Sequence, residues 1–428
     1  MQADASKANR YVVVLSNHAS DSEIVAAQQA LDCAFTHSSD LNKNLKAQQV
    51  YDQGKAVYFQ YLDAAVLEGV DPDRLAAAVR SDSPVLHFEA ERIFRPVGPL
   101  EQLEAIKATL ANLQNQILDL EQVLSTTNSP TLEPVVEPRP GTWGLNVMGL
   151  SRTAFTGEGV AVAVLDTGIF RNHPDFRSVN IKGKSFVQNG EWDGDANGHG
   201  THCAGTICGD KSDQNGRYYS VAPEVDLFVG QVLDRVGNGL TSGLIDGIDW
   251  ALSKNCRIIS LSLGAEARPG FGPSPLFERI GQRALERNCL IIAAAGNESQ
   301  RSAGLVKPVN SPADAKSIMA VAALNRRLSV ADFSNAGIND QTGGGVDLAA
   351  PGVDIYSAYS MLAPGGELYR SQDGTSMAVP HVAGLAALYM QRFPDLSAEE
   401  IWQKLTSNAQ QLDRQEAIDV GAGLARLL

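Results

Sequence analysis

The chain has 428 residues and a formal net charge of -14, and 44% of its residues are hydrophobic. This length exceeds that of an average domain, and the apolar share is enough for a large core. The negative charge argues against nucleic acid and anionic membrane surfaces as partners, and no apolar run reaches the length of a transmembrane helix.

The first residues of the chain are polar and lack the apolar centre of a signal peptide. We therefore expect either a cytoplasmic protein or a secreted protein whose signal has been removed. The chain has five cysteines, an odd number, and those outside the histidine segment lie mostly in apolar surroundings. We expect reduced, buried thiols rather than disulfides.

The first third of the chain predicts a small α+β domain over residues 1–97. Strands are predicted at 10–15 and 85–91, and a further strand at 55–62 continues through 64–67. Helices are predicted at 22–31 and 71–79, the second with a proline in its first turn. This order of elements is typical of a ferredoxin-like fold.

A long amphipathic helix is predicted next, at 100–124. Its apolar residues recur at steps of three and four, which makes a narrow stripe. Such a stripe could pair with another chain, although packing on the same protein is the commoner use. Four prolines between 130 and 140 then predict an extended linker. We therefore assign 98–141 as a connecting segment and 142–428 as a second domain.

Polar side chains follow two buried strands that are predicted in the second domain. Asp166 comes directly after the apolar run at 160–165, and Asn297 follows a similar run at 289–295. Ligand and catalytic groups of open α/β sheets gather at the carboxyl ends of the strands. A lone Asp or Asn in such a place more often serves a turn, so neither residue decides the function by itself.

A segment of small residues around His199 and His202 continues as a predicted helix. Two histidines could suggest a metal site, but no third ligand follows them in the pattern of a zinc helix. Asp193 and Asp195 precede His199 and offer the hard oxygen ligands that calcium prefers. Solvated loop acids are the alternative interpretation of this pair.

Ser376 opens a predicted helix that runs to about residue 393. A serine hydroxyl is a weak nucleophile and needs a nearby base. The unpaired N–H groups and the dipole at a helix N-terminus favour a developing negative charge beside it. Most single serines at this position are only N-caps, so the interpretation depends on the partners elsewhere in the chain.

Four segments occur in the order VAVLDTGI, NGHGTHCAGT, AAAGNE and GTSMAVPHVAG. Together they resemble the subtilisin-like serine proteases, in which the catalytic residues follow in the order Asp, His, Ser. The resemblance runs from about Trp143 to the end of the chain. It implies an α/β fold of three layers around a parallel sheet, and an endopeptidase that needs no cofactor for its chemistry.

The resemblance also implies a role for each of the four polar residues. Ser376 would be the nucleophile, and His199 the general base that takes its proton. Asp166 would orient His199, and Asn297 would donate to the oxyanion of the tetrahedral intermediate. The substrates implied are proteins or peptides, cleaved through an acyl-enzyme.

A substrate-binding cleft is implied as well, in which an extended peptide adds as a strand between two edges. The residues implied to line it are Gly237, Asn238, Gly239, Leu244, Ser262, Leu263, Gly264, Ala295, Gly296 and Asn310. Asn310 replaces a small residue that is common in the family. The pocket for the residue before the cleaved bond is therefore expected to be polar, and its preference stays open.

The position of Asp175 matches one that ligates calcium in many members of the family. A structural calcium ion is therefore expected as an option, with Asp175, Asp193 and Asp195 as its candidate ligands. The loop at 210–216 departs from the best-known calcium loop of the family, so no complete ligand set can be identified.

The domain at 1–97 resembles the inhibitory propeptides of subtilases. The resemblance implies that it assists folding and blocks the cleft as an intramolecular inhibitor until it is cut off. A permanent regulatory domain of similar fold is the alternative. The inserted segment leaves the cleavage site open between Gly98, residues 125–128 and no cleavage at all.

Two other functions remain open at this point. One is a binding protein that keeps the fold without turnover, against which the complete set of four polar residues argues. The other is a dedicated maturation peptidase that cuts one partner and keeps its N-terminal domain.

Overall fold

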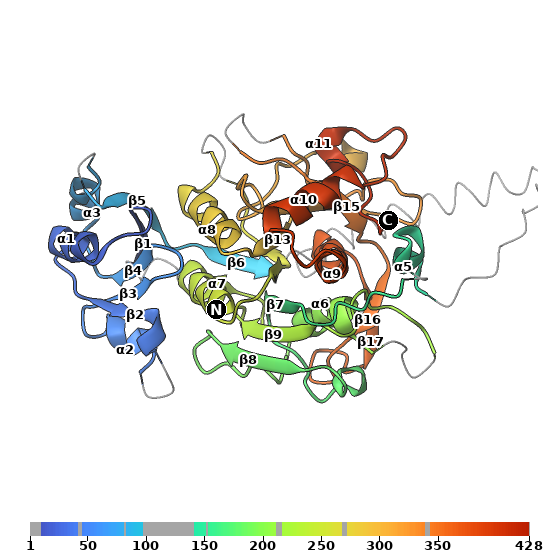
Figure 1. The fold of residues 1–428 in the computed structure, drawn as a ribbon, viewed down its shortest axis with the longest axis horizontal. Coiled ribbons are helices and arrows are strands. Elements are labelled where there is room, and N and C mark those ends of the chain that lie inside the picture. Colours follow the sequence, from blue (N-terminus) through green and yellow to red (C-terminus); the bar gives the residue numbers. More distant parts are fainter. Residues whose placement is uncertain are drawn as a thin grey trace, which may run out of the picture.

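The computed structural model describes residues 10–41, 45–80, 83–96, 141–150, 153–210, 216–267, 272–338 and 343–427. A small N-terminal unit lies beside a larger body (Figure 1). The predicted helix at 100–124 and the prolines of the predicted linker fall outside the described residues. None of the described helices combines the length and the apolar character that a membrane crossing needs.

The N-terminal unit is built on a five-stranded sheet in the order β2-β3-β4-β1-β5. Its elements are β1 (Arg10–Leu15), α1 (Asp21–Leu31), β2 (Phe35–His37), η1 (Ser38–Asp40), α2 (Ala47–Tyr51), β3 (Ala56–Phe59), β4 (Ala64–Glu68), α3 (Pro72–Ala78) and β5 (Val85–Ala90). The predicted helices and the strands at 10–15 and 85–91 are confirmed. The short elements β2, η1 and α2 were not predicted.

The strand predicted to continue from 55–62 through 64–67 is a hairpin instead. β3 and β4 pair antiparallel, and the chain reverses at Asp63, which has a φ of 48°. This left-handed backbone is uncommon for a residue with a side chain. It is held because the Asp63 carboxylate accepts from His18 N–H at 3.0 Å and forms an ion pair with Arg283 Nε at 3.0 Å.

The larger body contains a seven-stranded sheet in the order β15-β14-β13-β11-β7-β9-β8, and all its neighbouring strands are parallel. The strands are β7 (Ala161–Asp166), β8 (Ile181–Ser185), β9 (Asp226–Gln231), β11 (Ile258–Leu261), β13 (Leu290–Ala294), β14 (Met319–Leu324) and β15 (Leu348–Pro351). Its central strands are buried and almost entirely apolar, with Ser260 and the terminal Asp166 as the polar residues, because helices cover both faces. The fold is therefore the expected α/β arrangement of three layers.

Helices α6 (His199–Cys208) and α9 (Thr375–Arg392) pack against each other on one side of this sheet. Helices α7 (Thr241–Ser253) and α8 (Pro275–Glu286) lie on the other side, between the sheet and the N-terminal unit (Figure 1). The other elements are β6 (Ile93–Pro96), α5 (Trp143–Val147), η4 (Pro174–Phe176), β10 (Gly239–Leu240), β12 (Leu263–Gly264), η5 (Arg301–Ala303), β16 (Ile355–Ala358), β17 (Tyr369–Gln372), α10 (Ala398–Ser407) and α11 (Ala417–Val420). The five cysteines are all buried and unbridged, as expected.

The sheet of the N-terminal unit packs on α7 and α8 through buried polar contacts. The Asp249 carboxylate on α7 accepts from the Ser38 hydroxyl at 2.6 Å and from the Tyr61 N–H at 3.1 Å. Burial raises the pKa of Asp249 to about 7. The ion pair between Asp63 and Arg283 makes a second bridge, to α8. The contact between the two units therefore depends on buried carboxylates, and each carboxylate finds its hydrogen-bond or ion-pair partner in the other unit. Without these partners, burial of a carboxylate would cost free energy.

Two glycines of α7 differ in how closely the larger body packs against them. A Cβ at Gly247 would lie 2.7 Å from Val232 Cγ1, whereas a Cβ at Gly243 would meet only the Phe186 carbonyl oxygen, at 3.5 Å. We expect Gly247→Ala to lower the free energy of unfolding by about 1–3 kcal/mol through overpacking. Gly243→Ala should raise it by about 0.5–1 kcal/mol, because alanine is the better helix former. Thermal unfolding followed by circular dichroism checks both, and equal effects of the two variants would contradict this account of the packing.

Candidate active site

Asp166 and His199 form a buried pair at the carboxyl edge of the parallel sheet. Asp166 is the last residue of β7, and His199 is the first residue of α6. His199 Nδ1 lies 2.8 Å from Asp166 Oδ1. Gly198, just before the helix, has a φ of 95°, and the Tyr359 ring occupies the space that a Cβ would need. The glycine therefore allows α6 to begin directly at the histidine.

The surroundings distinguish His199 from the other two histidines near it. Burial opposes the charged form of His199, but the charges and hydrogen bonds of Asp166 and Cys203 together outweigh it and raise the pKa of His199 well above 6.5. Burial lowers the pKa of His202 to about 3 and that of His381 to about 4. His202 Nε2 donates to the Ile355 carbonyl at 2.8 Å, so it is a structural residue rather than a metal ligand beside His199.

Ser376 is buried at the second position of α9, as the sequence predicts. Its hydroxyl donates to the Ser262 carbonyl at 3.0 Å. The Cys203 thiol lies between the two helices, with its Sγ 3.9 Å from His199 Nδ1 and 3.6 Å from the Ser376 carbonyl oxygen. His199 Nε2, on the far side of the ring from Asp166, is buried and has no hydrogen-bond partner among the described residues.

Asn297 reaches the same place from the end of β13. Its Oδ1 accepts from the backbone N–H and from the hydroxyl of Thr375, both at 2.9 Å. Because Thr375, just before Ser376, holds the oxygen, the amide nitrogen is the donor that the side chain presents beside the start of α9. The structure thus brings together all four polar residues that the sequence singled out.

The two predicted edges of the cleft lie on either side of a third strand. β10 and β12 both pair antiparallel with β6, the last described strand of the N-terminal unit. Gly239 pairs with Phe94, and Leu263 pairs with Pro96. Figure 1 shows β6 reaching from the N-terminal unit into the larger body. The sequence predicted the edges but not the strand between them.

Side chains of β6 contact α8 and the residue just before β10. Phe94 is fully buried and meets Phe277 of α8 edge to face, with the ring centroids 5.4 Å apart. Arg95 Nε donates to Asn238 Oδ1 at 3.1 Å. Gly237 has a φ of 88°, and a Cβ there would lie 2.9 Å from Pro96 Cδ. The contact with Phe277 was missed, because a phenylalanine on an amphipathic helix is usually only a core residue.

Polar side chains that are distant in sequence meet at Asn310, where the sequence predicts a polar pocket. Glu298 Oε2 accepts from Asn310 Nδ2 at 3.0 Å and from Asn335 Nδ2 at 2.7 Å. Burial raises the pKa of Glu298. Gly296 has a φ of 120°, and the Asn335 amide occupies the place of a Cβ there. Nothing in the sequence pointed to Asn335. Among the other residues that the resemblance implies for substrate binding, Leu244 and Ala295 are buried.

The three candidate calcium ligands do not share a site. The buried Asp195 carboxylate accepts from the Thr167 hydroxyl at 2.8 Å and from the Gly198 N–H at 2.9 Å, so it braces the loop before His199. Asp193 is exposed. Among the described residues, the one group of three His, Cys, Asp or Glu side chains with ligand atoms within 4.8 Å is Asp166, His199 and Cys203. Asp175, Asp193 and Asp195 do not form such a group in the described part of the chain, and calcium binding at any of them stays a prediction.

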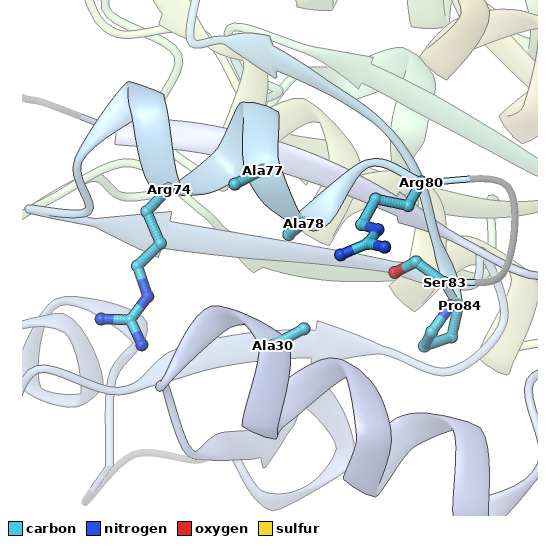
Figure 2. Close-up of a pocket in the computed structure, with 7 residues that line it drawn as sticks. All are labelled: Ala30, Arg74, Ala77, Ala78, Arg80, Ser83 and Pro84. Atoms are coloured by element: carbon cyan, nitrogen blue, oxygen red, sulfur yellow. The ribbon is translucent and has the colours of Figure 1, made fainter.

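A hollow elsewhere on the surface is unrelated to this site. It lies between α1 and α3 of the N-terminal unit (Figure 2). Its lining residues are Ala30, Arg74, Ala77, Ala78, Arg80, Ser83 and Pro84. None of the residues predicted to act in catalysis or binding takes part in it.

Comparisons with known proteins agree with this geometry. The chain is 34% identical over 348 residues to the Thermostable alkaline protease of Halalkalibacterium halodurans, a match that covers 79% of this chain and 85% of the relative. It is 36% identical over 258 residues to Subtilisin DY of Bacillus licheniformis, which covers 60% of this chain and 86% of that protein.

A solved structure of a cold adapted subtilisin-like serine proteinase aligns with 68% of this chain and 99% of its own, at 31% identity and a TM-score of 0.55. The profile of the subtilase family, Peptidase_S8, matches residues 157–423. The chain belongs to the subtilase family, and it is a subtilisin-like serine protease.

Proposed function

We propose that this protease is an endopeptidase made as a self-inhibited zymogen, with Ser376, His199 and Asp166 as its catalytic triad. The observation that carries the proposal is the pairing of β6 with both β10 and β12, beside Ser376. The chain's own N-terminal unit thereby occupies the place where a substrate strand would bind.

The pair of Asp166 and His199 suits general-base catalysis. Asp166 holds the Nδ1–H side of the ring, which leaves Nε2 to accept a proton from the Ser376 hydroxyl. The Ser376 Oγ then forms a bond to the peptide carbonyl carbon. Collapse of the tetrahedral intermediate breaks the C–N bond, and the amine leaves with the proton from Nε2. Water releases the acyl group by the same steps in reverse order.

The negative oxygen of the tetrahedral intermediate needs donors that are already in place. The Asn297 side chain is held through its oxygen by Thr375, so its amide N–H is directed without further ordering. The N-terminus of α9 adds its backbone N–H groups and the positive end of the helix dipole.

Carboxylates of the N-terminal unit support its docking as an inhibitor. Glu89 Oε1 accepts from the Ser274 hydroxyl at 2.6 Å and from the Leu276 N–H at 3.3 Å, at the start of α8. Glu91 Oε1 accepts from the Ser242 N–H at 3.1 Å, at the start of α7, where the N-cap residue provides no side-chain bond of its own. Both carboxylates face the positive end of a helix dipole, which favours docking.

The length of the match to one relative supports a precursor that includes the N-terminal unit. The match to the Thermostable alkaline protease is longer than the segment 157–423 that the family profile covers. Subtilisins need no cofactor for catalysis, and every group used above comes from the chain itself. Protein and peptide substrates follow from the protease activity, with the N-terminal unit as the proposed intramolecular partner.

The zymogen proposal predicts that the chain processes itself. Pro96 pairs with Leu263, and the neighbouring Ser262 carbonyl accepts from the Ser376 hydroxyl, so we propose a cut shortly after Pro96 and take Val97–Gly98 as the bond to test. Incubation of the purified chain should release a fragment that begins at Gly98, as read by intact mass and N-terminal sequencing. The Ser376→Ala variant should stay whole. If the wild type cuts peptides but also stays whole, the N-terminal unit is a permanent regulator, which is the alternative function.

The raised pKa of His199 predicts a pH profile. Only neutral His199 can accept the serine proton, so kcat/KM should rise with pH through a midpoint above 6.5, in the direction of the shift. Asp166→Asn should lower kcat by about 10⁴-fold and move the midpoint to lower pH, because the charge that raises the pKa is gone. Steady-state assays of the processed enzyme on a peptide substrate check this. An unchanged midpoint in the variant would contradict the pairing.

The oxyanion role of Asn297 predicts a loss confined to the chemical step. Asn297→Ala should lower kcat by about 10²–10³-fold with little change in KM. Asn238→Ala is a matched control on the substrate side, and we expect it to change KM more than kcat, because Asn238 contacts the bound strand through Arg95. A loss in Asn297→Ala that lies in KM alone would rule out the role.

A further inference from the structure

The Asp175 carboxylate is the position at which the family resemblance implied a calcium ligand. It is 3% exposed and lies in the short helix η4, after β7. Its Oδ2 accepts from the Tyr219 hydroxyl at 2.6 Å, and its Oδ1 accepts from the Tyr369 hydroxyl at 2.9 Å. Each carboxylate oxygen is therefore engaged by a separate phenol.

The surroundings of this carboxylate are aromatic rather than rich in oxygen. The Tyr369 ring stacks on Tyr356 with the centroids 5.5 Å apart, and its edge meets the His173 ring at 5.1 Å. No described His, Cys, Asp or Glu side chains join Asp175 in a group of three with ligand atoms within 4.8 Å. Calcium binds six to eight oxygens at about 2.3–2.6 Å, so these residues do not fit the ion.

The two phenols join segments that are far apart in the sequence. Tyr219 precedes β9, and Tyr369 begins β17, the strand after which the chain continues to Ser376. The Tyr219 hydroxyl also fills the space that a Cβ at Gly209 would need, at the end of α6. A single buried carboxylate thus ties three parts of the larger body together, which is a task that a bound cation performs through shared ligands.

We propose that the Tyr219 and Tyr369 hydroxyls take the place of a divalent cation at Asp175, so that this part of the fold is held together without metal. The phenol protons point at the carboxylate, since a carboxylate can only accept. Hydrogen bonds to an ionised acceptor are stronger than those between neutral groups, and burial strengthens them further.

The test uses the full chain with Ser376→Ala, which removes self-digestion under the proposed function; its readouts are independent of activity. The protein is stripped with EDTA, desalted, and titrated with calcium chloride or terbium chloride. Unfolding temperature and tyrosine-sensitised terbium emission are measured, each beside the same chain with Asp175→Asn. We expect neither ion to give a response that depends on Asp175.

The hydroxyls themselves are tested by removal. Tyr219→Phe and Tyr369→Phe should each lower the unfolding temperature by roughly 3–8 °C, because a buried carboxylate loses a donor. Tyr389→Phe is the matched control. Tyr389 is as buried as Tyr219 but donates to a neutral carbonyl, that of Arg426, at 3.2 Å, so the loss of its hydroxyl should cost less.

The outcomes separate clearly. A calcium-dependent rise in unfolding temperature that Asp175→Asn abolishes would overturn the proposal. So would Tyr219→Phe and Tyr369→Phe variants that are no less stable than Tyr389→Phe. A calcium response that persists in Asp175→Asn comes from another position and supports the proposal for Asp175. A wild-type chain that neither processes itself nor cuts peptides would concern the proposed function alone, because none of these readouts depends on protease activity.

Discussion

The close packing of α6 against α9 is the constraint on which the site depends. His199 is the first residue of one helix and Ser376 the second residue of the other, so the contact between the helices sets the distance between these two side chains. All ten residues of α6 are buried, and a Cβ at Gly205 would lie 2.6 Å from Ser357 Oγ. A larger residue there would move the helix that carries His199. Small residues in this layer are therefore part of the catalytic geometry.

The N-terminal unit contacts the larger body on the side of the parallel sheet opposite to α6 and α9. It contacts α7 and α8 with Glu89, Glu91 and Asp63, and it inserts β6 between the edges of the cleft. The contacts at the helix N-termini are made by carboxylates, whereas the strand contributes main-chain pairing. In the proposed zymogen, docking and blocking are thus carried out by different groups, and a substitution could weaken one without the other.

Local signals in the sequence predicted much of this structure. The strand before Asp166 was recognisable because a strand buried on both faces is apolar throughout, and Ser376 because small residues precede a long apolar helix. The turn at Asp63 was missed, since apolar residues continue on both sides of it. Pairing of β6 with β10 and β12, and the tyrosines at Asp175, depend on contacts between distant segments. Such contacts leave no periodic pattern in the sequence.

The shortness of β10 and β12 has a consequence for how the protein behaves when β6 is not between them. Each of these edges is two residues long, with glycine at one of the two positions. Unpaired strand edges are templates for self-association, and short edges limit that hazard. A peptide that pairs with one two-residue edge forms few main-chain hydrogen bonds. A strand that lies between β10 and β12 forms hydrogen bonds on both sides and binds more tightly. Under the proposed function, we therefore expect a single extended segment to bind here better than a folded surface.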